Sequence, residues 1–203
     1  MKKAFALTAL WAVCAACLLA QQPAERKIVA EGGGPDDRAS ARVLYWDTKA
    51  NAAAGQLAID YGRPVWKKDY EDPRKFDAIT KGKVWRLGSN WWTTLDTDLP
   101  ITISGKKIRP GHYYLGLQRS PDGSQWALAF LNPDGARREH LDAFDISKAT
   151  VDFVAPVSVD KPEGSSEKLT ITLSYPKEDF RNVTLKIAWG NLALSAPVKV
   201  AVE

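Results

Sequence analysis

Cysteine is scarce in this chain, and its two residues, Cys14 and Cys17, both lie close to the N-terminus. They fall in an uncharged apolar run, Ala4 to Ala20, that follows the short basic segment Met1-Lys2-Lys3. A basic segment, a short apolar run and small residues near a cleavage point are typical of a secretory signal peptide. Cleavage after Ala20 would leave no cysteine, which excludes disulfides, thiol catalysis and cysteine metal sites from the mature chain.

The chain also lacks an apolar run long enough to span a bilayer comfortably. Residues 4–20 fall short of the ~20 residues that a transmembrane helix needs, and polar Gln21 follows at once. We therefore expect a periplasmic or secreted protein without a transmembrane span. Processing at Cys17 as an outer-membrane lipoprotein is the alternative. Because Cys14 stands where leucine is usual in such signals, we favour a signal peptide over residues 1–20.

No part of the sequence carries a strong excess of one charge. The formal net charge is +4, and Lys2 and Lys3 leave with the predicted leader. An arginine-rich tract or basic stripe is absent, so nucleic acid is not an expected partner. Residues 21–40 hold three successive glycines and a proline among charged residues, which predicts a flexible polar tether. Residues 41–203 are then expected to form one domain with a well-buried core.

Long amphipathic helices are missing as well, and alternation with period two dominates the domain. The alternation is cleanest in the last third of the chain, where apolar residues alternate with threonine, serine or lysine. The only helix candidate is 136–149, and 67–81 is expected to be a long surface loop. Roughly nine to eleven short strands with regular turns predict an all-β fold, either an antiparallel β-sandwich or a jelly-roll-like barrel. We expect strands at 43–46, 57–61, 84–95, 101–103, 113–117, 126–130, 169–175, 183–189 and 198–202.

Motifs of known catalytic sites are absent too. The chain has two histidines, His112 and His140, and carries no Gly-x-Ser-x-Gly elbow, His-Glu-x-x-His helix or phosphate-binding glycine loop. We therefore expect no cofactor and no metal site. A hydrolase in which the fold brings His112 to a strand-borne serine or carboxylate is the enzymatic alternative.

Tryptophan is abundant, with eight residues in the chain. An indole combines a large apolar area with one N–H donor, so most of the tryptophans are expected to pack in the core. Trp91 and Trp92 are the exception. Adjacent strand residues point to opposite faces, so at most one of this pair can face a given core.

Cations and aromatic side chains crowd into residues 82–92, at the opening of an expected strand. An arginine fork can bind paired oxygens of a carboxylate, a phosphate or a sugar, and a neighbouring indole can stack on a ring. These properties suggest a shallow site for a small polar or glycan-like ligand. The candidate residues are Arg63, Lys83, Trp85, Arg86, Asn90, Trp91 and His112. The alternative is that the arginines only fasten loops, in a structural or assembly domain without a small-molecule site.

Several of these segments together resemble a known family, domain of unknown function (DUF) 2911. The likeness rests on Asp60-Tyr61-Gly62-Arg63-Pro64 and on Gly82-Lys83-Val84-Trp85-Arg86 with Gly88 and Asn90. It continues through 98–107, 110–113, Trp126, Asn132 and Ala188-Trp189, and so covers roughly residues 43–202. The resemblance implies an exported bacterial β domain without an established activity. After Asn90 the family tends to carry Glu or a small or polar residue, whereas Trp91 and Trp92 stand here.

Overall fold

The computed structural model describes residues 29–30 and 36–202. The signal peptide expected at 1–20 and most of the tether expected at 21–40 therefore lie outside the described residues. The chain divides into residues 1–35 and 36–203, and the second of these is the folded domain. Strand β1 begins at Arg38, so Arg38, Ala39 and Ser40 belong to the domain and not to the tether. Among the described residues, no helix has the length and apolar character needed to cross a bilayer.

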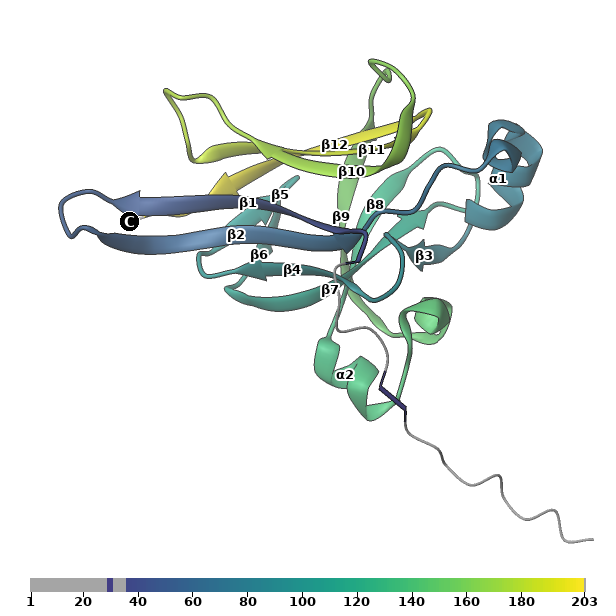
Figure 1. Ribbon diagram of the computed structural model, residues 1–203, viewed down its shortest axis with the longest axis horizontal. Helices are drawn as coiled ribbons and strands as arrows, with labels where there is room; N and C mark the ends of the chain where they lie inside the picture. Colours follow the sequence, from purple (N-terminus) through teal and green to yellow (C-terminus); the bar gives the residue numbers. More distant parts are fainter. Residues whose placement is uncertain (1–28, 31–35, 203) are drawn as a thin grey trace, which may run out of the picture. The chain divides into compact units, whose positions relative to one another are not determined.

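The described part of the domain is built mainly from strands (Figure 1). The strands are β1 (Arg38–Asp47), β2 (Ala52–Gly62), β3 (Val84–Arg86), β4 (Thr93–Thr97), β5 (Ile101–Ile103), β6 (Lys106–Ile108), β7 (Gly111–Arg119), β8 (Trp126–Leu131), β9 (Val151–Val159), β10 (Ser166–Ser174), β11 (Asn182–Gly190) and β12 (Leu192–Val200). The helical segments are η1 (Lys68–Glu71), α1 (Pro73–Thr80), α2 (Pro133–Arg138) and η2 (Ala143–Lys148). The prediction of an all-β single domain is confirmed.

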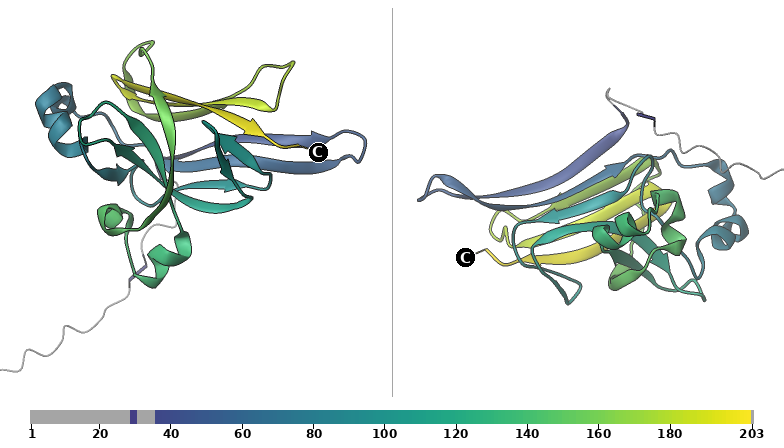
Figure 2. Two further views of the ribbon diagram at one scale, coloured as in Figure 1. Left: turned by 180° about the vertical axis from the view of Figure 1, so that it is seen from behind. Right: turned by 90° about the horizontal axis from the view of Figure 1, so that it is seen from below.

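All the strand pairs are antiparallel and join into one 12-stranded sheet that does not close. Its main path runs β1-β2-β4-β7-β8-β9-β12-β11-β10, with β3 beside β7 and the β5–β6 hairpin beside β12. The sheet folds over so that β10, β11 and β12 form a layer across from β1, β2 and β4 (Figures 1 and 2). This arrangement is an antiparallel sandwich rather than a closed barrel.

The first and last strands of the path, β1 and β10, meet along a seam that side chains and loop backbone hold together. At one end of the seam, Trp66 N donates to Glu167 O at 2.7 Å. In its middle, the Tyr61 hydroxyl accepts from Ile171 N at 2.9 Å and donates to Ile171 O at 3.2 Å. At the other end, the Tyr45 hydroxyl donates to Phe180 O at 3.2 Å. Only Tyr45 of these residues lies in β1, since Tyr61 lies in β2 and Trp66 follows β2. The bonds therefore join the β1–β2 hairpin and the loop after it to β10 and the turn that follows β10, without a continuous strand ladder.

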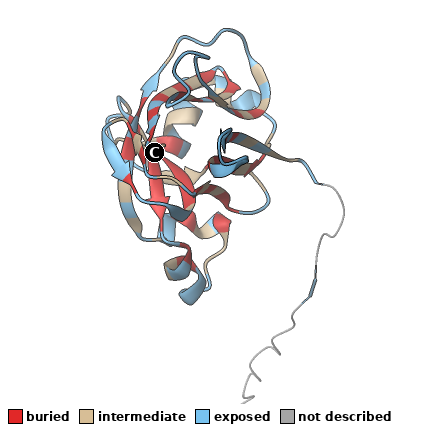
Figure 3. Cartoon of the chain, turned by 90° about the vertical axis from the view of Figure 1, so that its left-hand side faces the viewer, coloured by how far each residue is buried: buried red, intermediate tan, exposed pale blue. Residues whose placement is uncertain are grey.

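Most of the buried residues, red in Figure 3, belong to the strands of the two layers. In β12, Leu192, Leu194, Ala196, Val198 and Val200 are buried and alternate with exposed or half-buried residues. The same alternation orders β4 and β11. Each large aliphatic side chain buried in this way contributes roughly 1.5–3 kcal/mol of transfer free energy. The core is therefore the one that the period-two pattern predicts.

A smaller cluster lies on the outer face of the β7–β8 region, beneath α2 and η2. It contains buried Trp92, Tyr114 and Leu131, with Ala143 and Ile146 of η2 packed on them. The single helix expected over 136–149 is thus two short ones. The chain breaks between them because His140 has a φ of 53°, and Asp142 then caps a new helix by accepting from Phe144 N at 2.7 Å.

Two further expectations need correction. The stretch 67–81 is not a plain loop, because it contains η1 and α1, with Asp72 capping α1 and Pro73 in its first turn. The strand expected over 84–95 is interrupted between β3 and β4. Gly88 and Asn90 have φ values of 124° and 66°, outside the range of an extended strand. The strand β9, which carries Pro156, was not among those that the alternation indicated.

Candidate functional site

Trp85, a candidate ligand-stacking residue, faces the interior. Its ring centroid lies 5.7 Å from that of Trp189 and 6.3 Å from that of Trp126. Its indole nitrogen is buried without a hydrogen-bond partner in the described residues. Trp85 is therefore part of an aromatic cluster within the sandwich.

Arg86 lies on the opposite face of β3, because neighbouring strand residues point to opposite sides. Its guanidinium carbon is 3.9 Å from the centroid of the Phe144 ring. Burial lowers the pKa of Arg86, and the nearby Asp142 carboxylate opposes that shift. Trp85 and Arg86 are thus separated by the sheet and do not form one ligand-binding surface.

The other loop candidates make contacts that hold the fold. Arg63 Nε donates to Leu169 O at 3.3 Å, which fastens the chain after β2 to β10. Lys83 Nζ donates to Ala78 O at 2.6 Å, close to the end of α1. Asn90 and Trp91 are exposed in the loop before β4, whereas Trp92 is buried. At most one of the pair is buried, as predicted, but neither lies in a strand, and Trp92 is buried in the cluster beneath α2 and η2 and not in the core between the layers.

His112 is the candidate site residue whose side chain is hydrogen-bonded to a carboxylate. It lies directly opposite Asp96 in the β4–β7 pair, and its Nδ1 is 2.5 Å from Asp96 Oδ1. Its ring also contacts the edge of Tyr114, with centroids 5.7 Å apart. Within the described residues, no serine or threonine hydroxyl is hydrogen-bonded to this imidazole. The pair can orient a base, but it lacks an adjacent hydroxyl nucleophile.

Exposed aromatic side chains gather at a different place, between the outer end of β1 and the segment that joins β10 to β11. Trp46 is 52% exposed, Tyr175 48% and Phe180 44%. Together with Tyr45 and Arg181 they line an open groove of about 390 Å³. We call this the hairpin groove, after the β1–β2 hairpin that forms one of its walls.

Tyr45 ties the two walls of the hairpin groove together. Its ring lies 6.2 Å from that of Phe180 at 53°, and its hydroxyl donates to the Phe180 carbonyl. Burial, with a smaller contribution from Tyr175, raises the pKa of Tyr45 to about 12. The hydroxyl therefore stays a donor at neutral pH, and the groove has a fixed base beneath its exposed rings.

Polar groups surround these rings. The Arg181 guanidinium lies 5.7 Å from the Phe180 ring centroid. Asp47 Oδ1 accepts from Lys49 N and Ala50 N at 2.8 and 2.9 Å, which leaves Oδ2 as an acceptor. A ligand in the groove would thus find stacking surfaces, donors and an acceptor within one concavity.

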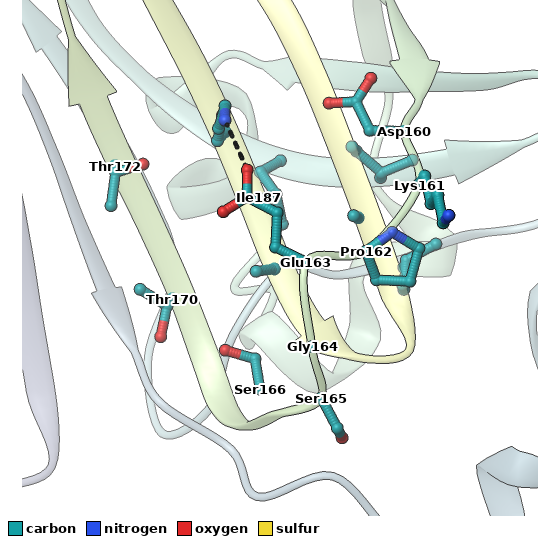
Figure 4. A pocket seen from close by; sticks show the side chains of 15 residues that line it. Asp160, Lys161, Pro162, Glu163, Gly164, Ser165, Ser166, Thr170, Thr172 and Ile187 are labelled. Carbon is teal, nitrogen blue, oxygen red and sulfur yellow. Dashed lines mark hydrogen bonds and ion pairs between the residues drawn. The ribbon is translucent and has the colours of Figure 1, made fainter.

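A second groove, of about 310 Å³, lies between the 160–165 loop and the outer face of β10, β11 and β12 (Figure 4). The hydroxyls of Thr170, Thr172 and Ser166 face it (Figure 4). Glu163 Oε1 and Lys186 Nζ pair across it at 3.4 Å. None of its lining residues is aromatic, so it offers no stacking surface.

A family model described as "Protein of unknown function (DUF2911)" matches residues 46–198. The chain belongs to the DUF2911 family. The match begins at Trp46 and extends into β12, so it includes the three exposed rings of the hairpin groove of this DUF2911 domain. Searches of curated proteins and of solved structures each returned no significant match.

Sequence reasoning missed the hairpin groove. A signal was present, because Leu44-Tyr45-Trp46 is an unbroken apolar run in a strand that can bury only one face. Tyr175 and Phe180, however, stand in a charged, proline-containing turn that resembles any surface loop. Only the seam between β1 and β10 brings these distant segments of the DUF2911 domain together.

Proposed function

We propose that this DUF2911 protein is an exported, non-catalytic binding module whose hairpin groove holds a glycan-like ligand. The observation that carries the proposal is the grouping of Trp46, Tyr175 and Phe180 as exposed rings around one groove. Exposed apolar surface of this kind has a solvation cost that a bound ligand removes. The apolar face of a sugar ring stacks on such rings, and its hydroxyls need nearby donors and acceptors.

The polar groups around the groove suit that chemistry. Arg181 supplies several donors in a planar fork, and the Asp47 carboxylate supplies an acceptor. A volume of about 390 Å³ is enough for one or two sugar rings, since ligand sites typically measure roughly 300–1,000 Å³. Export would place the module among the glycans of the cell envelope or its surroundings. The His112–Asp96 pair, without an adjacent hydroxyl, does not support a hydrolase to the same degree.

A glycan array, followed by titration of each hit against the mature protein, tests the proposal. Trp46→Ala should weaken binding of a hit at least tenfold, because stacking on an indole is lost while the groove keeps its shape. Trp91→Ala is the matched control. Trp91 is 53% exposed, close to the 52% of Trp46, but lies outside the groove.

Unchanged thermal melting of both variants would show that the fold is intact. Equal affinities of the Trp46→Ala variant and the wild-type protein would remove the groove as the site. An array without a hit would favour a structural or assembly domain instead.

A further inference from the structure

Basic side chains gather around a hollow of about 460 Å³ beside β6 and the start of β7. Lys106, Lys107, Arg109 and His112 line it, and so does Asn132, which precedes α2. Asp152 is the one carboxylate among its lining residues. We call this the basic hollow. It lies apart from the hairpin groove, since none of its residues lines that groove.

Two cations of the basic hollow, Lys107 and Arg109, have no carboxylate partner among the described residues. Lys106 has an aromatic partner instead, with its Nζ 5.1 Å from the centroid of the Phe153 ring. The charges of Lys107 and Arg109 are therefore available to an anion from outside.

A neutral amide in the hollow is also oriented as a donor. Asn132 Oδ1 already accepts from Asp134 N at 2.9 Å, which leaves the amide NH₂ group free to donate. The bond between His112 Nδ1 and Asp96 fixes the imidazole at the edge of the hollow, and His112 is not counted among the donors to an anion because the second nitrogen of a neutral imidazole is an acceptor. Lysine, arginine and a side-chain amide are the groups that proteins use for oxyanions, through charge-assisted hydrogen bonds.

We propose that the basic hollow binds a tetrahedral oxyanion, a phosphate or sulfate group carried by a small molecule or a lipid. Such a group offers several oxygens at once, so it can accept from two or more of these donors. The cations are confined to one hollow and do not form a stripe, which favours a compact anionic group over an extended polyanion. The proposal does not depend on the hairpin groove.

Isothermal titration of the mature protein with inorganic phosphate, and separately with sulfate, tests this site. We expect saturable binding of one ion per chain against a background of chloride at matched ionic strength. The double variant Lys107→Gln/Arg109→Gln should weaken that binding at least tenfold. The control is Lys49→Gln/Arg74→Gln, which removes the same charge from exposed positions outside the hollow.

Equal weakening by the control would show that net charge, and not the hollow, attracts the anion, and would overturn the proposal. Vesicles of phosphatidylglycerol form a second arm. Vesicle binding that Lys107→Gln/Arg109→Gln abolishes, without binding of the free ions, would identify a lipid headgroup as the source of the phosphate. Failure of both free ions and vesicles to bind would also overturn the proposal.

Discussion

At the scale of single residues, the direction in which a strand side chain points decides its role. On β3, the side chains of neighbouring residues alternate between the two faces of the sheet. The same alternation separates Trp85, which packs inside, from Arg86, which packs outside on Phe144. A cluster of cations and indoles in sequence is therefore not a cluster in space when it lies on a strand.

The Tyr45 hydroxyl predicts that the stability of the fold depends on pH in the alkaline range. Burial raises the pKa of this hydroxyl from 10.0 to about 12, so in the unfolded chain it ionises earlier than in the folded protein. Its stabilising contribution is complete below pH 10 and is lost as the pH rises to about 12. The free energy of unfolding, measured by urea titration at several pH values, should fall across this range.

Tyr45→Phe should flatten that alkaline decline. At pH 7 it should cost about 1 kcal/mol, because the bond to the Phe180 carbonyl is lost. Tyr70→Phe, which removes a hydroxyl at a distant aromatic cluster, serves as the comparison. An alkaline slope in Tyr45→Phe as steep as that of the wild-type protein would contradict the assignment.

At the scale of elements, periodicity predicted the strands whose two faces differ in burial. The strands β10, β11 and β12 follow the alternation closely. The break between β3 and β4 was not predicted, because the pattern of apolar residues does not indicate the left-handed backbone of Asn90. The helix α1 had readable signals in Asp72 and Pro73, but its charged surroundings resembled a loop.

The hairpin turn between β11 and β12 offers a prediction at this scale. Gly190 has a φ of +55°, and a Cβ added there would lie 1.9 Å from Trp66 Cδ2. Gly190→Ala should therefore destabilise the fold by about 2–4 kcal/mol, from backbone strain and overpacking together. Chemical denaturation measures the loss.

Gly105→Ala is the matched control, since Gly105 has a φ of +85° but a Cβ added there would meet no atom within 4 Å. Its cost should be only about 1 kcal/mol, from the backbone alone. Equal losses for the two substitutions would mean that the Trp66 contact does not constrain the turn.

At the scale of the whole molecule, the candidate site was the least predictable feature. Arg63, Arg86 and His112 come from separate parts of the sheet, and the structure does not bring them into one concavity. The hairpin groove and the basic hollow depend on which strands become neighbours. That pairing is a property of the completed sheet, and local patterns of apolar residues do not predict which strands become neighbours.

Export is also a prediction about the whole molecule. We expect mass spectrometry of protein from the producing bacterium to find an N-terminus at Gln21, because the apolar run 4–20 resembles a signal peptide. Cys17→Ser should leave this product unchanged. A product that begins at a lipid-modified Cys17 would instead establish the lipoprotein alternative, and an intact Met1 would contradict export.

The seam between β1 and β10 has a mechanical consequence. Backbone hydrogen bonds join its two sides at Trp66 and Glu167, whereas in the described part of the chain one side-chain bond, from the Tyr45 hydroxyl, joins them at the hairpin groove. The seam is therefore joined by backbone bonds at the Trp66 end and by a single side-chain hydroxyl at the hairpin groove. A ligand in the hairpin groove would restrain the β1–β2 hairpin and residues 175–181. The backbone hydrogen bonds at the Trp66 end of the seam would change little.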